Sequence, residues 1–180
     1  MSENTVRLAV VIGSVREGRF GPVVAAWFAE RARRRPEFSV DVVDLLETGL
    51  DAGFTERIGT ADAVVIVTPE YNHSFPGPLK TAIDATGAEW RDKPVGFVAY
   101  GGLSGGLRAV EHLRPVLAEL HAVGLRDTVS FHGAAGAFDS TGRPREEVAG
   151  AAATVLLDAL TWWARTLRRA RLEHAAGSPT

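Results

Sequence analysis

The sequence predicts an open parallel α/β sandwich, in which one five-stranded sheet lies between two layers of helices. Five short apolar runs lack the polar alternation of a sheet that faces solvent, as expected for parallel strands buried on both faces. Helical segments and Gly-rich turns separate these runs, and this alternation of strand and helix is typical of a parallel sheet.

The composition is that of an ordinary globular domain, with 46% hydrophobic and 23% charged residues among 180. We expect one domain over residues 1–172 and a flexible tail over residues 173–180. The net charge of -2 offers no basic field for nucleic acid. No stretch approaches the roughly 20 apolar residues of a membrane span, and none resembles a signal peptide. We therefore expect a cytoplasmic protein with no membrane partner.

Several kinds of chemistry are excluded by residue type. The chain has no cysteine, which rules out disulfides, thiolate catalysis and cysteine-ligated metals. The five histidines are scattered, and none is spaced as a pair of metal ligands. We expect no metal site.

The first half of the chain contains three predicted strands. Residues 6–12 are apolar and β-branched and end at a Gly-Ser turn. In residues 20–35 apolar side chains recur at helical spacing, and arginines in the last turn complement the helix dipole. Residues 38–44 form the second strand. Residues 45–59 are predicted as a loop with a short helical piece, and the wholly apolar residues 63–67 form the third strand.

The second half alternates in the same way. Pro78 suits the first turn of the helix that follows the third strand. Pro115 lies within a longer apolar-striped helix and predicts a kink there. The elements are predicted, in order, at residues 79–85 (helix), 94–100 (strand), 107–123 (helix), 126–132 (strand) and 145–169 (helix).

Five strands of this kind most often adopt the flavodoxin-like strand order 2-1-3-4-5. In that order the first strand lies beside the third, and the fourth is the next neighbour. Because the carboxyl ends of parallel strands share one edge of the sheet, the loops after these three strands should surround a single crevice.

The loop after the first strand has the features of a phosphate site. It leads into a helix N-terminus, where free amides and the helix dipole favour an anion. A hydroxyl and two guanidinium groups are close at hand. The loop lacks both the nucleotide-triphosphate motif and the dinucleotide fingerprint, and a plain turn with solvated arginines is the alternative. The candidate phosphate-binding residues are Ser14, Arg16, Arg19, Phe20 and Gly21.

The loop after the third strand is dense in polar and aromatic groups. Two prolines stiffen it, a phenol offers a face for stacking, and amide and hydroxyl groups can bond the edge of a heterocycle. A rigid structural turn is the alternative. The candidate cofactor-binding residues are Pro69, Glu70, Tyr71, Asn72, His73 and Ser74.

The loop after the fourth strand is rich in glycine, so a ligand could approach its backbone closely. Together the three loops offer a phosphate socket, a stacking wall and an amide-lined edge, which suit a mononucleotide with a large flat base such as FMN. The candidate residues here are Gly101, Gly102, Ser104, Gly105 and Gly106.

The sequence resembles the NAD(P)H-dependent FMN reductase family of flavodoxin-like flavoproteins, which includes quinone, chromate and azo-dye reductases. Residues 69–80 with 82–84 resemble the family's signature loop and helix start. The motif Gly13-Ser14-x-Arg16 resembles its phosphate loop, and residues 101–106 with Arg108-Ala109 resemble its third loop. The resemblance covers about residues 6–123.

The resemblance implies a role for each loop. Ser14, Arg16 and residues 19–21 would hold the FMN phosphate, residues 69–74 would run along the isoalloxazine, and residues 101–106 would meet its pyrimidine side. The chain departs from the pattern at Arg19 and Gly21, where many members carry a small hydroxyl residue and Asn.

The resemblance also implies an FMN-dependent oxidoreductase. Hydride would pass from NADPH or NADH through FMN to a small-molecule electron acceptor, such as free flavin, a quinone or an azo compound. The cofactor carries the chemistry, so we expect no catalytic side chain. A spare arginine such as Arg19 could favour the 2′-phosphate of NADPH.

Family members are usually homodimers or dimers of dimers. Here the helix of Leu79 and one of Trp162 and Trp163 would lie at the interface. Two other functions stay open from the sequence. One is a flavodoxin-type electron carrier, which usually has a strongly acidic surface, and the other is a flavin-binding module without enzymatic activity.

Overall fold

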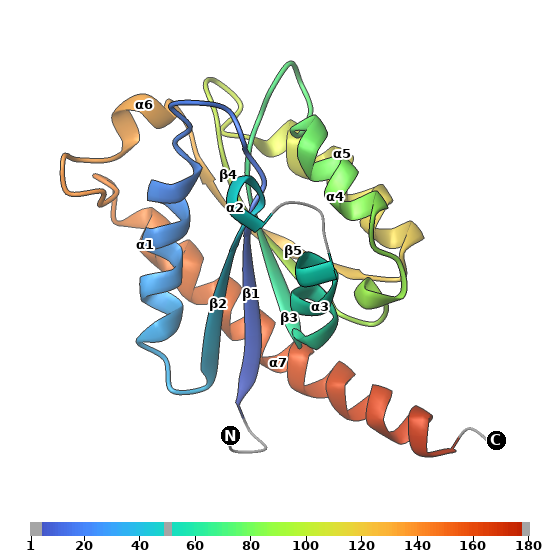
Figure 1. The fold of residues 1–180 in the computed structure, drawn as a ribbon. Helices are drawn as coiled ribbons and strands as arrows, with labels where there is room; N and C mark the ends of the chain where they lie inside the picture. Colours follow the sequence, from blue (N-terminus) through green and yellow to red (C-terminus); the bar gives the residue numbers. More distant parts are fainter. Residues whose placement is uncertain (1–4, 49–51, 178–180) are drawn as a thin grey trace.

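The computed structural model describes residues 5–48 and 52–177. One parallel sheet of five strands runs through the molecule in the order β2-β1-β3-β4-β5, which confirms the predicted fold and strand order (Figure 1). The strands are β1 (Val6–Ile12), β2 (Phe38–Asp44), β3 (Ala63–Pro69), β4 (Pro94–Tyr100) and β5 (Val123–Phe131).

Helices cover both faces of the sheet (Figure 1). Helices α1 and α7 pack on one face, and α3, α4 and α5 pack on the other. The helical elements are α1 (Gly21–Arg33), α2 (Leu45–Thr48), α3 (Ala52–Thr60), α4 (Gly77–Asp84), the 3-10 helix η1 (Ala88–Trp90), α5 (Leu107–Glu119), α6 (Ala134–Ala137) and α7 (Val148–Gly177).

The two faces of the sheet build two separate cores, because successive side chains of a strand point to opposite faces. On β1, Val10 joins the core that contains Phe28 of α1, whereas Val11 joins the core that contains Phe54 of α3. Every residue of β3 and β4 is buried, as their unbroken apolar runs predicted.

The structure corrects several predicted boundaries. The segment predicted as mostly loop forms α2 and α3, because Phe54 and Ile58, four residues apart, bury one helical face against the sheet. Gly49, Leu50 and Asp51 lie outside the described residues. Helix α5 ends at Glu119, four residues before the predicted end. Strand β5 begins at residue 123, three residues before its predicted start, and α7 begins at residue 148, three residues after its predicted start.

Helix α7 continues to Gly177, so residues 173–177 are helical where the sequence suggested a tail. Residues 178–180 lie outside the described residues, and the flexible tail stays a prediction. Among the helices that the structure describes, none combines the length and the apolar character needed to cross a bilayer.

Candidate functional site

Direct contacts join the loops after β1, β3 and β4. The Ser14 hydroxyl lies 2.8 Å from the Tyr71 hydroxyl, which links the first loop to the second. Glu70 accepts a hydrogen bond from the Ser104 hydroxyl, which links the second loop to the third. The three loops lie at the carboxyl edge of the sheet, at the top of Figure 1. The predicted site residues therefore come together at one edge.

The first loop presents backbone amides that have no protein partner. Between Ser14 and Gly18, no amide N–H donates a hydrogen bond to any residue that the structure describes. The loop closes with a bond from the Arg19 amide to the Arg16 carbonyl (3.2 Å) and passes Gly18 at a φ of 64°. It then enters α1 at Gly21, at the positive end of the helix dipole. These donors form an arrangement suited to an anion.

The two arginines of the first loop have different roles. The exposed Arg16 guanidinium lies 4.1 Å from the centre of the Tyr71 ring, a cation–π contact at the rim of the site. The Arg19 guanidinium instead makes two bonds to the Asp44 carboxylate (2.5 and 2.7 Å) and one to the Ser14 carbonyl (2.9 Å). The Asp44 hydrogen bond is the main reason why the Arg19 pKa is raised.

This arrangement shows what the Arg19 side chain bonds within the chain, and its predicted role in cofactor binding stays a prediction. Its guanidinium joins the first loop to Asp44 at the end of β2. The sequence could not show this, because Asp44 is 25 residues away and reads as an ordinary strand-end carboxylate.

Tyr100, at the end of β4, belongs to the site although the sequence did not single it out. Its hydroxyl is buried and, within the described part of the chain, is the buried side-chain polar atom without a hydrogen-bond partner. Burial raises its pKa, and nearby Ser14 and Arg19 offset only part of that shift. A Cβ atom at Gly21 would lie 3.0 Å from this hydroxyl and 2.9 Å from Ile12. The Tyr100 ring and Ile12 thus explain why glycine stands at position 21.

The second loop is a tight hairpin rather than a flat wall. Tyr71 and Ser74 exchange backbone hydrogen bonds of 2.8 and 3.1 Å. Asn72 and His73 form its tip, both with positive φ (49° and 71°), as in a type I′ turn. Both tip residues are exposed, and Pro69 is buried as the last residue of β3. The Ser74 hydroxyl lies 3.0 Å from His112 Nδ1 on α5.

Glu70 holds the third loop in place. Its carboxylate accepts hydrogen bonds from the Ser104 hydroxyl, from the Arg108 amide (3.2 Å) and from the Arg108 guanidinium (3.1 Å). Burial alone would raise the pKa of Glu70, but the bonds from Ser104 and Arg108 outweigh it and keep the pKa lowered. Glu70 therefore stays ionised and acts as a structural clamp.

The third loop needs its glycines for its own fold. Gly105 and Gly106 have positive φ, and a Cβ atom at Gly105 would lie 2.7 Å from His132, whereas one at Gly106 would lie 2.7 Å from the Tyr100 amide. At Gly102 no atom lies within 4 Å of the Cβ position, so this glycine faces open space. The expected close approach of a ligand thus suits Gly102, while Gly105 and Gly106 pack against β4 and β5.

Two residues of β5 and its exit also support this loop, and the sequence did not indicate them. The Ser130 hydroxyl donates to the Gly105 carbonyl (2.9 Å), and His132 Nδ1 lies 2.9 Å from the Leu103 carbonyl. Leu103 is left 92% exposed at the tip of the loop. Among the described residues, no cluster of histidine and acidic side chains could hold a metal ion.

The family model for NADPH-dependent FMN reductase matches residues 6–136. The chain belongs to this family. The matched segment includes all three loops, from Ser14 to Gly106. The family predicted from the sequence is therefore confirmed.

Individual relatives agree with this assignment. An NAD(P)H-dependent FMN reductase of Schizosaccharomyces pombe is 35% identical over 122 residues, which cover 57% of this chain and 61% of that protein. A quinone reductase of Escherichia coli K12 is 36% identical over 142 residues, which cover 68% of this chain and 74% of that protein. This chain thus spans less than two thirds of the S. pombe relative.

A solved structure shows the same fold. The flavoenzyme NAD(P)H:(acceptor) oxidoreductase FerB of Paracoccus denitrificans matches with a TM-score of 0.68 and 23% identity, over 90% of this chain and 98% of that one.

The donor set of the first loop fits the phosphate of the family's cofactor. Unpartnered amides from Ser14 to Gly18, the N-terminus of α1 and the unpaired Tyr100 hydroxyl all point to an anion that accepts hydrogen bonds. In this chain the Tyr100 hydroxyl lies next to position 21, where many family members carry Asn.

Proposed function

We propose that this protein oxidises NADPH or NADH and delivers the electrons, through FMN bound at the three loops, to a small acceptor of the quinone type. The observation that carries the proposal is the row of amides from Ser14 to Gly18 without protein partners, beside the buried and unpaired Tyr100 hydroxyl. The names of two relatives, an FMN reductase and a quinone reductase, support the choice of donor and acceptor.

We assign the residues as follows. The Ser14 hydroxyl, the amides that follow it, Arg16 and the start of α1 hold the phosphate. The hairpin from Pro69 to Ser74 runs along the ring system, and the loop from Gly101 to Gly106 lies at its pyrimidine side. Bound FMN supplies the group that accepts and returns hydride. The chain positions that group and offers backbone dipoles to it, so no side-chain acid or base is assigned.

We further propose a homodimer in the cytoplasm, where the nicotinamide donors are available. Of the two adjacent tryptophans, Trp162 is 60% exposed and supports this proposal, whereas Trp163 packs against the core of the α1–α7 face. The apolar side of α4 does not support it, because Leu79, Ala82 and Ile83 are buried within the chain's own core.

The test is to prepare the protein free of flavin, titrate FMN by fluorescence, and then follow NADPH and NADH oxidation with a benzoquinone, free FMN and an azo dye. We expect one FMN per chain and rapid turnover with the quinone. Ser14→Ala should weaken FMN binding about tenfold, because it removes one bond to a charged group, while Ser140→Ala in an exposed turn should not.

Stoichiometric FMN uptake without oxidation of either nicotinamide by any acceptor would leave a flavin-binding protein that is not a reductase. Failure to bind FMN would contradict the proposal altogether.

A further inference from the structure

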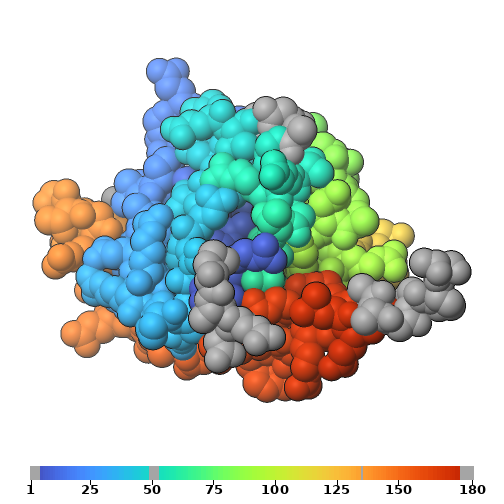
Figure 2. Space-filling model, turned by 60° about the horizontal axis from the view of Figure 1, so that its bottom comes forward, coloured from blue at the N-terminus to red at the C-terminus, as the bar shows by residue number. Residues whose placement is uncertain are grey.

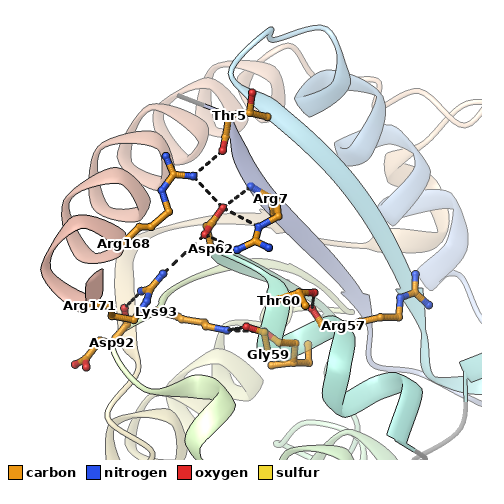
Figure 3. Close-up of polar contacts among 11 residues, drawn as sticks. Thr5, Arg7, Arg57, Gly59, Thr60, Asp62, Asp92, Lys93, Arg168 and Arg171 are labelled. Atoms are coloured by element: carbon orange, nitrogen blue, oxygen red, sulfur yellow. Dashed lines mark hydrogen bonds and ion pairs between the residues drawn. The ribbon is translucent and has the colours of Figure 1, made fainter. Parts of the chain in front are cut away.

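Several charged side chains lie at the amino edge of the sheet, opposite the loops after β1, β3 and β4. Parallel strands also share their amino ends, so Arg7 at the start of β1, Asp62 just before β3 and Lys93 just before β4 lie side by side. Helix α7 adds Arg168 and Arg171 from its C-terminal half. Figure 2 shows this end of the molecule, where α7 (red) lies beside the start of β1 (blue), and Figure 3 shows the side chains.

Asp62 is the buried anion of this cluster, with 1% of its surface exposed. Its carboxylate accepts bonds from the Arg7 amide, Nε and Nη2 (2.9, 3.3 and 3.2 Å) and from Arg168 Nη1 (3.2 Å), and Arg171 Nη2 lies 3.9 Å away. Burial alone would raise the pKa of Asp62, but the bonds from Arg7 and the charge of Arg168 outweigh it and lower the pKa. One carboxylate thus faces three guanidinium groups.

Lys93 adds a further buried cation, 5% exposed. Its ammonium donates to the carbonyls of Ile58 and Gly59 (2.6 and 2.7 Å) at the C-terminal end of α3. Carbonyl groups satisfy its hydrogen bonds but carry no full charge that neutralises it. Burial, with the added repulsion of nearby Arg171, lowers the pKa of Lys93 to about 8.

The cluster carries a surplus of positive charge within the described residues. Arg171 donates to another carbonyl, that of Asp92, and Arg168 to that of Thr5 (2.7 Å). The carboxylates Glu89 and Asp92 line the same hollow as Lys93 and Arg171, and so does the exposed cation Arg91. Even with Arg168 left out of the count, cations outnumber carboxylates among the described residues. The cations are Arg7, Arg91, Lys93 and Arg171, and the carboxylates are Asp62, Glu89 and Asp92.

Two neighbouring hollows open onto this surplus charge. One, of about 700 Å³, has Leu167 and Ala170 on an apolar side. Its polar side includes three cations and two carboxylates, Arg91, Lys93, Arg171, Glu89 and Asp92. The other, of about 310 Å³, is lined by Arg7, Asp62 and Arg168, and it shares Lys93 and Arg171 with the first. We call the larger hollow the basal cavity. Its size is that of a pocket for a small molecule.

We propose that the basal cavity binds a small organic anion, with its phosphate or carboxylate group against Arg171 and Lys93 and its apolar part against Leu167 and Ala170. Arg7 and Arg168 bond Asp62 directly, and the bond from Arg168 holds α7 against the sheet. A structural role is therefore enough to explain these two arginines. It accounts neither for an open cavity beside Lys93 and Arg171 nor for the excess of cations around it.

The test uses FMN-loaded protein, so that the phosphate loop is filled, and measures binding by calorimetry at low salt. The probes are phenyl phosphate, benzoate, inorganic phosphate and phenol. We expect one of the two aromatic anions to bind more tightly than inorganic phosphate, because it also covers the apolar wall, and phenol not to bind. Which aromatic anion binds better distinguishes a phosphate from a carboxylate ligand.

Arg171→Gln should weaken this binding at least tenfold, because it removes a guanidinium from the cavity wall. Arg169→Gln, on the exposed side of α7, is the matched control and should leave it unchanged. If Arg171→Gln alters the circular dichroism spectrum, the exposed Arg91→Gln takes its place, with at least a threefold loss expected. Binding that is absent in the wild type, equal for phenol, or unaffected by removing the cation would overturn the proposal.

Discussion

Tyr100 illustrates how a single side chain can serve a ligand at the expense of the ligand-free fold. Its hydroxyl is buried near Gly21 and near Ser14, which is close enough to lower its pKa, but no described group meets it at hydrogen-bond geometry. A buried hydroxyl without a partner destabilises a protein by about 1–3 kcal/mol. An anion bound at the first loop would remove that cost by accepting the bond.

We therefore predict opposite effects of Tyr100→Phe on stability and on binding. Without FMN, the free energy of unfolding should rise by about 1 kcal/mol, because the unpaired hydroxyl is gone. FMN affinity should fall about fivefold or more, because the phosphate loses a donor. Urea denaturation of the apo protein and fluorescence titration measure the two effects.

Tyr71→Phe is the matched comparison, since the Tyr71 hydroxyl already has a partner 2.8 Å away in Ser14. Its loss should destabilise the apo protein. If Tyr100→Phe destabilised the apo protein in the same way, the Tyr100 hydroxyl would have a partner of its own and the assignment would be wrong.

At the scale of elements, the loop after β4 depends on its neighbours. Glu70 holds it from the second loop, and Ser130 and His132 hold it from β5. Its left-handed turn at Gly105 and Gly106 lets the backbone return tightly against β4. The loop is therefore rigid where it meets the sheet and open at Gly102 and Leu103.

A pair of glycine substitutions tests this division. Gly105→Ala should destabilise the protein by about 1–3 kcal/mol, because alanine at a φ of 62° is strained and its Cβ atom would collide with His132. Gly102→Ala, which meets no atom within 4 Å, should leave stability unchanged within about 0.5 kcal/mol. Thermal denaturation measures the stability of both variants. Equal losses of stability at the two positions would contradict this account of the loop.

At the scale of the whole molecule, α7 connects distant regions. Its buried side packs Leu156 and Leu160 against the sheet, and its C-terminal half carries Arg168 and Arg171 to the amino edge. Its outer side leaves Val155 and Trp162 half or more exposed, seven residues apart and hence on one stripe of the helix. A tryptophan exposed in this way is typical of an interface.

If α7 forms the proposed dimer contact, Trp162→Arg should convert the dimer to a monomer, because a buried unpaired charge is costly at an interface. Leu46 is an exposed apolar residue on α2, away from α7, so Leu46→Arg is the control and should leave the dimer intact. Light scattering after gel filtration gives the mass of each. A wild-type monomer, or a dimer that tolerates Trp162→Arg, would contradict the assignment.

Local patterns were sufficient to predict most of the fold. The boundaries of β1, β2 and β4 match the predicted ones, because wholly apolar runs and the turns that bound them are local signals. Helix α3 was missed because its apolar side chains Phe54 and Ile58 are too few to show a helical period against two flanking glycines. The strand order brought Ser14, Tyr71 and Ser104 to one edge, as expected.

The sequence by itself determined the fold, the family and the three loops that gather at the carboxyl edge, because strand burial, turn chemistry and a conspicuous motif are encoded within short stretches. Only the tertiary structure showed that Arg19 is bound to Asp44, that Tyr100 enters the site unpaired, and that Asp62 and Lys93 meet the arginines of α7. These pairings join residues far apart in the chain, and hydrogen bonds and charges act through space.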